Sequence, residues 1–474
     1  MNDSWPDIKT IVNNVKSGKV TATELVKQSL KRITDAKDYK SIISTTEKLA
    51  LQRAKKIDEA VKKGKVNGKL LGVPFIAKDN FLVYGADSTA ASNILRGFDA
   101  PYQATAINLL EEEGAICVAK ANLDAFAHGS STENSDFFTS KNPYDKTRVP
   151  GGSSGGSASA VALNLAPFSL GTDTGGSIRL PASYCGVVGY KPTYGLVSRS
   201  GVIAMASSAD VIGPIANSVS DVAEVLEVIA GKDSLDSTTI DRDSQPYNNL
   251  EQSSKPTIGI VKEYFAEGLN TDVEKIIKAQ ISKLEKNGYK VKEISIPTLH
   301  LALACYYVLC PAEISSNLSR YDGQRFGYSY PKAKDLDESY EKSRTIGFGK
   351  EAKRRIMIGT YVLSSGYYDA YYKQAQTVRT KLINEFKKAF SQADILLGPT
   401  APAVAFKIGQ NTKDPLAMYL IDIMTVGANL VGVPAISLPV GKVGKLPVGL
   451  QLMAKQNADR QLLALSANIE RLNK

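Results

Sequence analysis

The first part of the chain alternates polar and apolar residues with a helical period. The stretch Thr21-Ala22-Thr23-Glu24 is a capping box, which predicts the start of a helix because threonine and glutamate satisfy each other's backbone N–H groups. The apolar face of this helix consists of Leu25, Leu30 and Ile33. A second helix, which Gly64 can end, carries Leu49, Ala54, Ile57 and Val61. We therefore predict peripheral helices over residues 1–64.

From residue 70 to about residue 230, short apolar runs alternate with helical segments. The run Leu70–Ala77 predicts a buried strand that ends at Lys78. A helix over Thr105–Glu113 ends at Gly114, and a second buried strand covers Ala115–Lys120. A small-residue helix over 157–162 precedes another short strand over 167–170. This order predicts an α/β core over residues 70–230.

The second half contains further strands and one long helical segment. We predict strands at Thr257–Val261, Tyr289–Ile296, Asp394–Pro399 and Ala435–Pro439. Residues 300–390 are expected to be mostly helical, apart from the polar stretch 331–347, which predicts a mobile loop over a site. The last helix covers about 458–472. Since the sequence has no internal repeat and no convincing linker, we predict one domain over residues 1–474.

The amino-acid composition indicates which class of protein this is. An apolar content of 43% and a charged content of 22% are typical of a soluble globular protein. The four cysteines lie in apolar or glycine-rich surroundings without a C-x-x-C pair, and two histidines cannot complete a zinc set, so no metal site is expected. The N-terminus lacks the pattern of a signal peptide, and the longest apolar runs are too short to span a bilayer. These features predict a cytoplasmic protein without a membrane segment.

The net charge of +10 has two interpretations. It can indicate a polyanion such as nucleic acid as a partner, or it can reflect solvated, lysine-rich helices. Basic residues are spread along the chain without an aromatic-interleaved cluster, which favours the second interpretation.

The stretch Gly151–Ser177 carries the candidate chemistry. It contains two Gly-Gly-Ser triplets, at residues 151–153 and 175–177. The glycines can be simple turns, a phosphate cradle, or an oxyanion hole beside a serine nucleophile. The phosphate motifs G-x-x-x-x-G-K-[ST] and G-x-G-x-x-G are absent from the sequence.

A serine nucleophile needs a base. The two histidines, His128 and His300, allow a Ser-His-Asp triad in principle, but their spacing does not favour one. Lys78 is the other candidate, because it ends an apolar strand where α/β proteins form their sites. A lysine acts as a base only when burial lowers its pKa.

Three motifs, FIAKDN, GGSSGGSASA and GTDTGGSIRLPAS, are similar to those of the amidase signature family. The resemblance covers nearly the whole chain and implies a central mixed β-sheet covered by helices on both faces. It implies a catalytic set of Ser177 as nucleophile, Ser153 as bridging serine after a cis peptide bond, and Lys78 as base. It also implies an oxyanion hole of N–H groups from Thr174, Gly175 and Gly176 up to Ser177. His128 departs from the methionine that is usual in the family.

Three later stretches resemble the branch of this family that hydrolyses glutamine within aminoacyl-tRNA amidotransferases. They lie at residues 305–323, 348–356 and 418–423. The resemblance implies that Arg355 binds the carboxylate of glutamine, that Asp422 binds its ammonium group, and that Tyr306 helps to hold it. The sequence leaves open whether Arg354 or Arg355, and whether Tyr306 or Tyr307, faces the substrate.

The same resemblance implies partners. Two other subunits would complete a heterotrimer, in which ATP and magnesium bind the partner and misacylated tRNA is contacted mainly by the partner. The ammonia would amidate Glu-tRNA(Gln), and Asp-tRNA(Asn) stays open as a second acceptor. No cofactor is expected in this chain. The alternative is a stand-alone amidase that uses the same three catalytic residues on another small amide.

Overall fold

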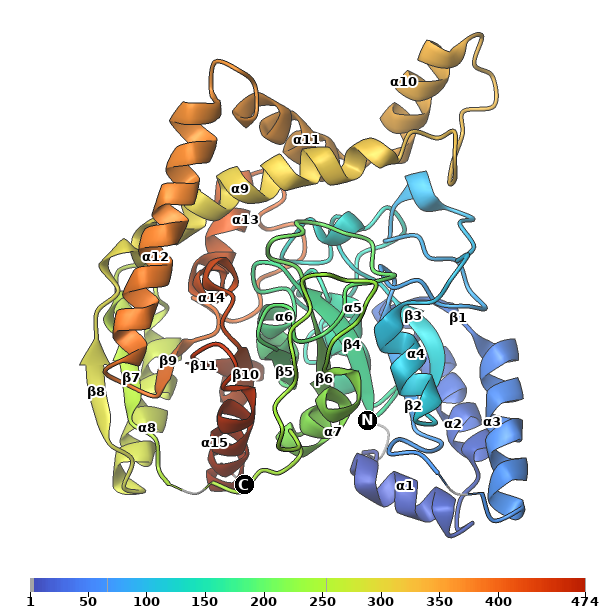
Figure 1. Ribbon diagram of the computed structural model, residues 1–474, viewed down its shortest axis with the longest axis horizontal. Coiled ribbons are helices and arrows are strands. Elements are labelled where there is room, and N and C mark those ends of the chain that lie inside the picture. The colour runs from blue at the N-terminus through green and yellow to red at the C-terminus, as the bar shows by residue number, and fades with distance from the viewer. Residues whose placement is uncertain (1–3, 66, 253, 474) are drawn as a thin grey trace.

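One sheet of eleven strands organises the part of the chain that the computed structural model describes, residues 4–65, 67–252 and 254–473. The strand order is β1-β3-β2-β4-β6-β5-β10-β11-β9-β7-β8 (Figure 1). The strands are β1 (Ile42–Thr45), β2 (Pro74–Lys78), β3 (Ile116–Ala121), β4 (Phe168–Asp173), β5 (Val188–Lys191), β6 (Val211–Ala216), β7 (Ile258–Val261), β8 (Val291–Ile294), β9 (Ile395–Pro399), β10 (Ala435–Val443) and β11 (Leu446–Ala454). β2 pairs in parallel with β3 and β4, β7 pairs in parallel with β8 and β9, and antiparallel pairs link the two groups. The sheet is therefore mixed, as predicted.

Helices cover both faces of the sheet. Alternate residues of a strand point to opposite faces, and β6 illustrates the result. Ile212 and Ala216 share a core with residues of α7 (Val219–Ile229) and α15 (Asp459–Leu472), whereas Ile215 packs with residues of α5 (Gly155–Ala162) and α6 (Arg179–Cys185). The predicted α/β fold with helices on both faces is confirmed.

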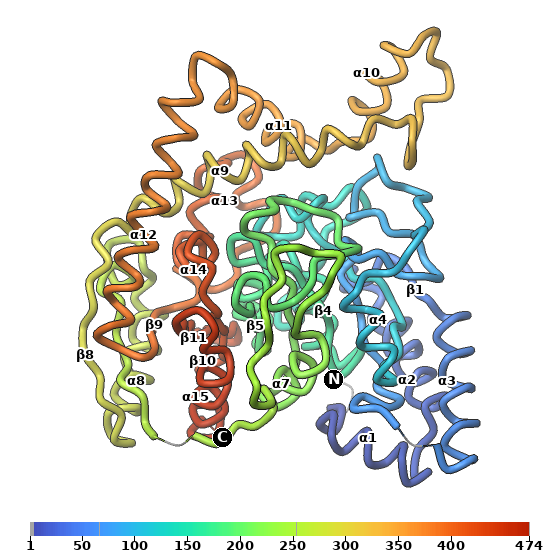
Figure 2. The backbone as a smooth tube through the Cα atoms, in the orientation of Figure 1, coloured from blue at the N-terminus to red at the C-terminus, as the bar shows by residue number. Residues whose placement is uncertain are grey.

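The remaining helices lie around this core. They are α1 (Ile8–Lys16), α2 (Ala22–Asp35), α3 (Glu47–Lys62), α4 (Thr105–Glu112), α8 (Thr271–Lys286), α9 (Ala302–Asn317), α10 (Leu336–Gly347), α11 (Lys350–Val362), α12 (Gln374–Phe390), α13 (Pro415–Tyr419) and α14 (Val426–Val431). The backbone trace shows α9 lying across the upper end of the sheet region, with α11 beside it (Figure 2). Within the described residues, one helical stretch, Pro297–Arg320, is long and apolar enough to cross a membrane. Because its α9 part packs against α11, α12 and α14, it serves here as a core helix.

Most predicted elements are present, with shifted ends. The N-terminal helices are α1, α2 and α3, but β1 lies among them and adds an antiparallel edge strand to β3, which the sequence analysis did not include. The predicted domain limits, residues 1 and 474, lie outside the described residues, and the division into one domain stays a prediction.

The predicted loop over residues 331–347 is wrong, because α10 occupies Leu336–Gly347. Asp335 caps this helix, since its side chain accepts from the backbone N–H of Glu338. α10 buries few side chains and leaves Leu336, Tyr340 and Ile346 exposed. A helix that packs so little has no apolar stripe to reveal it in the sequence.

Candidate active site

Lys78 lies at the carboxyl end of β2, at the centre of the predicted catalytic set. Its Nζ donates to Ser153 Oγ at 2.8 Å and lies 2.8 Å from Thr172 Oγ1. Lys78 and Ser153 are completely buried. Ser153 precedes α5 and Thr172 lies on β4, so two neighbouring strands and a helix N-terminus hold the three side chains together.

Burial changes the chemistry of this lysine. It lowers the pKa of Lys78 to about 7, although the carboxylates of Asp124, Asp173 and Asp210 oppose the shift. A large fraction of the amine is therefore neutral near neutral pH. A neutral amine that touches a serine hydroxyl can accept its proton, so the site holds a competent base.

Ser177 lies in the loop between β4 and α6, next to Ser153. Its carbonyl oxygen accepts from the backbone N–H of Ser154 at 3.0 Å, and the Gly152–Ser153 peptide is cis, as the family resemblance implied. No hydrogen bond joins the two hydroxyls of Ser153 and Ser177 in the described part of the chain. The structure thus brings Lys78 and Ser153 into direct contact and places the backbone of Ser177 against the same loop.

A buried carboxylate shapes the loop that carries Ser177. Asp173 accepts from the backbone N–H groups of Gly176, at 2.9 Å, and Ile178, at 3.1 Å. It also pairs with the buried Arg179 at 2.9 Å. The N–H of Gly176 already donates to Asp173. The backbone N–H groups of Thr174, Gly175 and Ser177 therefore remain as donors for the predicted oxyanion hole.

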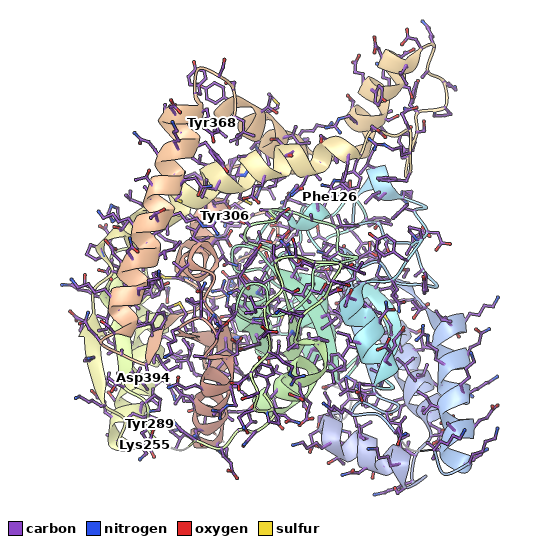
Figure 3. All side chains as sticks on the ribbon, in the orientation of Figure 1. Phe126, Lys255, Tyr289, Tyr306, Tyr368 and Asp394 are labelled. Carbon is purple, nitrogen blue, oxygen red and sulfur yellow. The ribbon has the colours of Figure 1, made fainter. Side chains whose placement is uncertain are left out.

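Close packing keeps side chains out of this loop. A Cβ at Gly175 would lie 2.7 Å from a ring carbon of Tyr306, and a Cβ at Gly176, where φ is +133°, would lie 2.1 Å from Thr425 Oγ1. Tyr306 therefore covers the predicted oxyanion loop directly. Figure 3 shows Tyr306 beneath α9, in the upper part of the molecule.

A small cavity of about 80 Å³ opens beside this centre. Its lining includes Arg355 and Glu351 from α11, Tyr307 from α9, and Ser130. Arg355 is buried, whereas the side chain of Arg354 is 43% exposed, so Arg355 is the inward-facing arginine. Both arginines line the cavity, so Arg355 as the arginine that faces the substrate stays a prediction, which its burial favours.

Asp422 lies next to the pocket, behind two of its lining residues, Ser130 and Tyr307. Ser130 Oγ lies 2.8 Å from both of its carboxylate oxygens, and the Tyr307 hydroxyl donates to it at 3.3 Å. Burial raises the pKa of Asp422 to about 7, which the bond from Ser130 and the charge of Arg355 oppose. Tyr307 therefore contacts the predicted ammonium site, while Tyr306 covers the oxyanion loop, so both tyrosines belong to the site.

Four residues of the site were not predicted from the sequence: Ser130, Thr172, Glu351 and Tyr419. Thr172 lies within the motif GTDTGGSIRLPAS, and Ser130 lies two residues after His128. Glu351 and Tyr419 lie in the stretches 348–356 and 418–423 that carry the resemblance, but only the fold shows that they hydrogen-bond each other across 68 residues.

Neither histidine takes part in a triad. His128 is buried 6.1 Å from the ring of Phe126, and both of its ring nitrogens lack a partner among the described residues. Burial, together with the charge of Arg355, lowers the pKa of His128 well below its usual value. The His300 ring lies against the carbonyl oxygen of Pro297.

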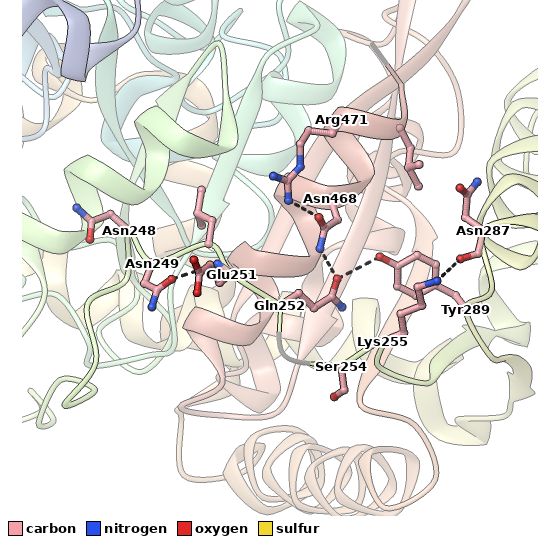
Figure 4. A pocket seen from close by; sticks show the side chains of 12 residues that line it. Asn248, Asn249, Glu251, Gln252, Ser254, Lys255, Asn287, Tyr289, Asn468 and Arg471 are labelled. Carbon is pink, nitrogen blue, oxygen red and sulfur yellow. Dashed lines mark hydrogen bonds between the residues drawn. The ribbon is translucent and has the colours of Figure 1, made fainter.

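Another cavity, of about 1070 Å³, lies away from this chemistry. Polar side chains such as Gln252, Lys255, Asn468 and Arg471 line it (Figure 4). Lys255 and Tyr289 lie at the opposite end of the molecule from Tyr306 (Figure 3). The small cavity is the better candidate for the substrate site because Arg355 lines it and because Ser130, which also lines it, lies against Gly152, next to Ser153.

Comparisons with known proteins agree with this geometry. The amidase family profile matches residues 24–463. The A subunit of glutamyl-tRNA(Gln) amidotransferase from Thermoanaerobacter pseudethanolicus is 50% identical over 463 residues, 97% of this chain and 95% of that protein. The protein of the same name from Macrococcus caseolyticus is 46% identical and covers 100% of this chain and 98% of its own.

Solved structures give the same result. The crystal structure of the glutamyl-tRNA(Gln) amidotransferase A subunit from Thermotoga maritima superposes with a TM-score of 0.79 at 38% identity, covering 99% of this chain and 96% of that one. A crystal structure described as an amidase superposes with a TM-score of 0.83 at 29% identity, covering 99% of this chain and 100% of that one.

Proposed function

This chain belongs to the amidase family, and we propose that it is the glutamine-hydrolysing subunit of a Glu-tRNA(Gln) amidotransferase. The observation that carries the proposal is the contact of a buried lysine of lowered pKa with Ser153, near a pocket that Arg355 lines and whose Ser130 holds Asp422. The identity of about 50% to curated A subunits of this enzyme supports the same assignment.

The reaction follows from the positions of these groups. Neutral Lys78 accepts a proton from Ser153, which accepts one from Ser177, and Ser177 Oγ attacks the side-chain amide carbon of glutamine. Backbone N–H groups of the loop over Thr174–Ser177 stabilise the oxyanion. The proton then passes to the leaving nitrogen and ammonia departs. Water cleaves the acyl-serine to release glutamate, so the overall reaction is glutamine plus water to glutamate plus ammonia.

The pocket suits a zwitterion. In the described residues Arg355 and Asp422 do not form an ion pair with each other, so a cation and an anion are available for the carboxylate and the ammonium group of one small molecule. An apolar acyl group would leave the buried Nη1 of Arg355 without an acceptor and would offer Asp422 no cation, which is costly. We therefore propose glutamine over the alternative, a stand-alone amidase for an apolar amide. Faster hydrolysis of aryl or fatty amides than of glutamine would contradict this choice.

The pKa of Lys78 predicts the pH dependence. Because the base must be neutral, kcat/KM for glutamine falls about tenfold per pH unit below the pKa of about 7 and levels off above it. Asp422 must be ionised to bind the ammonium group of glutamine. Because its pKa is about 7, its protonation at lower pH lowers kcat/KM for glutamine further. Glutaramate, which is glutamine without the amino group, isolates the contribution of Lys78. A flat profile for glutaramate from about pH 5.5 to about pH 7.5 would contradict the role of Lys78.

We propose further that the ammonia is used by a partner. Two other subunits would complete a cytoplasmic heterotrimer, in which the partner binds ATP, magnesium and most of the tRNA. In the described part of the chain, most of the exposed large hydrophobic side chains lie between Leu301 and Leu420, on the helical segment over the pocket. Concentrated exposed apolar surface is typical of a protein–protein interface and supports this proposal.

The partner proposal is tested by following the amide nitrogen. The chain is co-purified from its native cell and assayed with Glu-tRNA(Gln), ATP, magnesium and amide-labelled glutamine. We expect label in Gln-tRNA(Gln) with the complete complex and none when Ser177→Ala replaces this chain, while free ammonium restores amidation. A chain that purifies alone, and whose glutaminase activity no partner changes, would contradict the proposal. Parallel assays with Asp-tRNA(Asn) decide whether that acceptor is also used.

A further inference from the structure

One carboxylate on α11 gathers three donors beside the substrate pocket. Glu351 Oε1 accepts from Arg355 Nε at 2.9 Å and from the Tyr419 hydroxyl at 2.9 Å. Its other oxygen pairs with Arg354. Glu351 is only 8% exposed, so these bonds form largely out of water, where charge-assisted hydrogen bonds are strong. The three partners hold the Glu351 carboxylate in one position, and the carboxylate in turn holds the Arg355 guanidinium in place.

Glu351 binds one edge of the Arg355 guanidinium, the edge that carries Nε. The rings of Tyr307 and Tyr419 stack at 3.9 Å, and the guanidinium carbon lies 5.3 Å from the first ring and 5.7 Å from the second. Arg355 Nη1 is buried and lacks a partner within the described residues. A buried charged donor without an acceptor is costly, so its position indicates a ligand oxygen that completes it.

We propose that Glu351 is a positioning residue that holds the Nε edge of Arg355 so that Nη1 meets the α-carboxylate of glutamine. Tyr419 and Arg354 serve the same end by holding Glu351. This inference rests on the proposed function, because it assumes that glutamine is the substrate. It assigns to Glu351 no contact with the reacting amide, so the effect falls on glutamine binding and not on the chemical step.

A purely structural role makes a different prediction. Glu351 and Arg355 are one helical turn apart, and such pairs also occur simply to stabilise helices. Loss of a structural pair lowers the melting temperature and affects every substrate alike. Loss of a positioning residue affects only substrates that carry the α-carboxylate, since Arg355 touches nothing else of the substrate.

The experiment compares two substrates and three variants of the full chain, together with any subunits that co-purify. The substrates are glutamine and 4-aminobutanamide, which is glutamine without its α-carboxylate. The variants Glu351→Ala, Glu351→Gln and Tyr419→Phe are compared with wild type for KM, kcat and melting temperature. Glu274→Gln is the matched control, because Glu274 forms a helical pair with Lys278 on α8, outside the site.

We expect Glu351→Ala to raise KM for glutamine about tenfold or more with kcat little changed, as loss of a charge-assisted hydrogen bond predicts. Glu351→Gln should raise it less, because its amide oxygen can still accept from Arg355, and Tyr419→Phe less again. kcat/KM for 4-aminobutanamide should stay at its wild-type value, and Glu274→Gln should match wild type. If Glu351→Ala does not fold, the other two variants carry the test.

Two results would overturn the inference: a KM for glutamine that stays at its wild-type value in the Glu351 variants, or an equal loss for both substrates. The proposed function fails in a different way. In that case the wild-type chain itself does not prefer glutamine to 4-aminobutanamide, whatever stands at position 351.

Discussion

Replacing the nucleophile should abolish glutamine hydrolysis. We expect Ser177→Ala to lower kcat by about a thousandfold or more, because no other group can form the acyl bond and the loss of a serine nucleophile has costs of this order. Binding should survive, since Arg355 and Asp422 are untouched. The measurement is the release of ammonia and glutamate under single-turnover conditions, with glutamine binding followed by calorimetry.

The control for this variant is Ser466→Ala. Ser466 is also buried, but it lies on α15, where its hydroxyl donates to the carbonyl oxygen of Leu462. It should keep wild-type activity. Rapid quenching of the wild-type reaction, followed by mass spectrometry, should find the acyl group on the peptide that contains Ser177. Ser177→Ala with a tenth or more of the wild-type rate, or an acyl group on another residue, would contradict the assignment.

The family resemblance could identify the candidate catalytic set because its motifs are local, although the residues alone left the base open between histidine and lysine. The Gly-Gly-Ser triplets and the apolar run before Lys78 each specify a loop or strand end within a few residues, and the structure puts Lys78 and Ser153 2.8 Å apart. Lys78 ends β2, Ser153 lies just before α5, and α5 leads into β4, which pairs with β2, so the topology brings the two side chains together. Local pattern and topology therefore agree at this site.

The substrate pocket could be predicted only in part. Ser130 and Asp422 are 292 residues apart in sequence, and their contact depends on how α9, α11 and the segment before α14 pack over the sheet. Glu351 looks from the sequence like one charge in a solvated helix turn. Its role depends on Tyr419, which lies in another element, so residue type and spacing could not reveal it.

The sequence did not reveal β11, because complete burial removes the alternation of apolar and polar residues that indicates a strand. β11 is buried along all nine residues, so its apolar and polar positions do not alternate, and a short apolar run of this kind does not distinguish strand from helix. α10 was missed for the opposite reason, because it buries too little. Fully buried strands such as β2, β3 and β9 were still predicted, because each is a short apolar run.

A lowered pKa is not enough to identify a lysine as a catalytic base. Burial lowers the pKa of Lys191 to about 7 as well, with the nearby Arg179 acting in the same direction. Its Nζ donates to the carbonyl oxygen of Pro192, at 3.0 Å, and not to a serine hydroxyl. Lys78 differs in its contact with Ser153. The catalytic role therefore requires both the shifted pKa and the position.

The second large effect is expected when Lys78 is replaced. Lys78→Arg should lose about a hundredfold or more in kcat, because general-base catalysis contributes this much and a guanidinium stays charged at all accessible pH values. With glutaramate as substrate, for which Asp422 binds no ammonium group, the pH dependence below pH 7 should disappear with the base. Lys191→Arg is the matched control, since it places the same larger side chain in a comparably buried lysine site. It should keep activity of the wild-type order, measured per folded molecule.

Chemical rescue separates loss of the base from damage to the fold. Lys78→Ala leaves a cavity next to Ser153, and small primary amines added to the solution should restore part of the activity in proportion to their neutral fraction. Because the neutral form is the active one, rescue should increase with pH up to the pKa of the added amine. Rescue that follows the protonated amine would assign Lys78 an electrostatic role, and Lys78→Arg with near wild-type activity would remove it from the mechanism altogether.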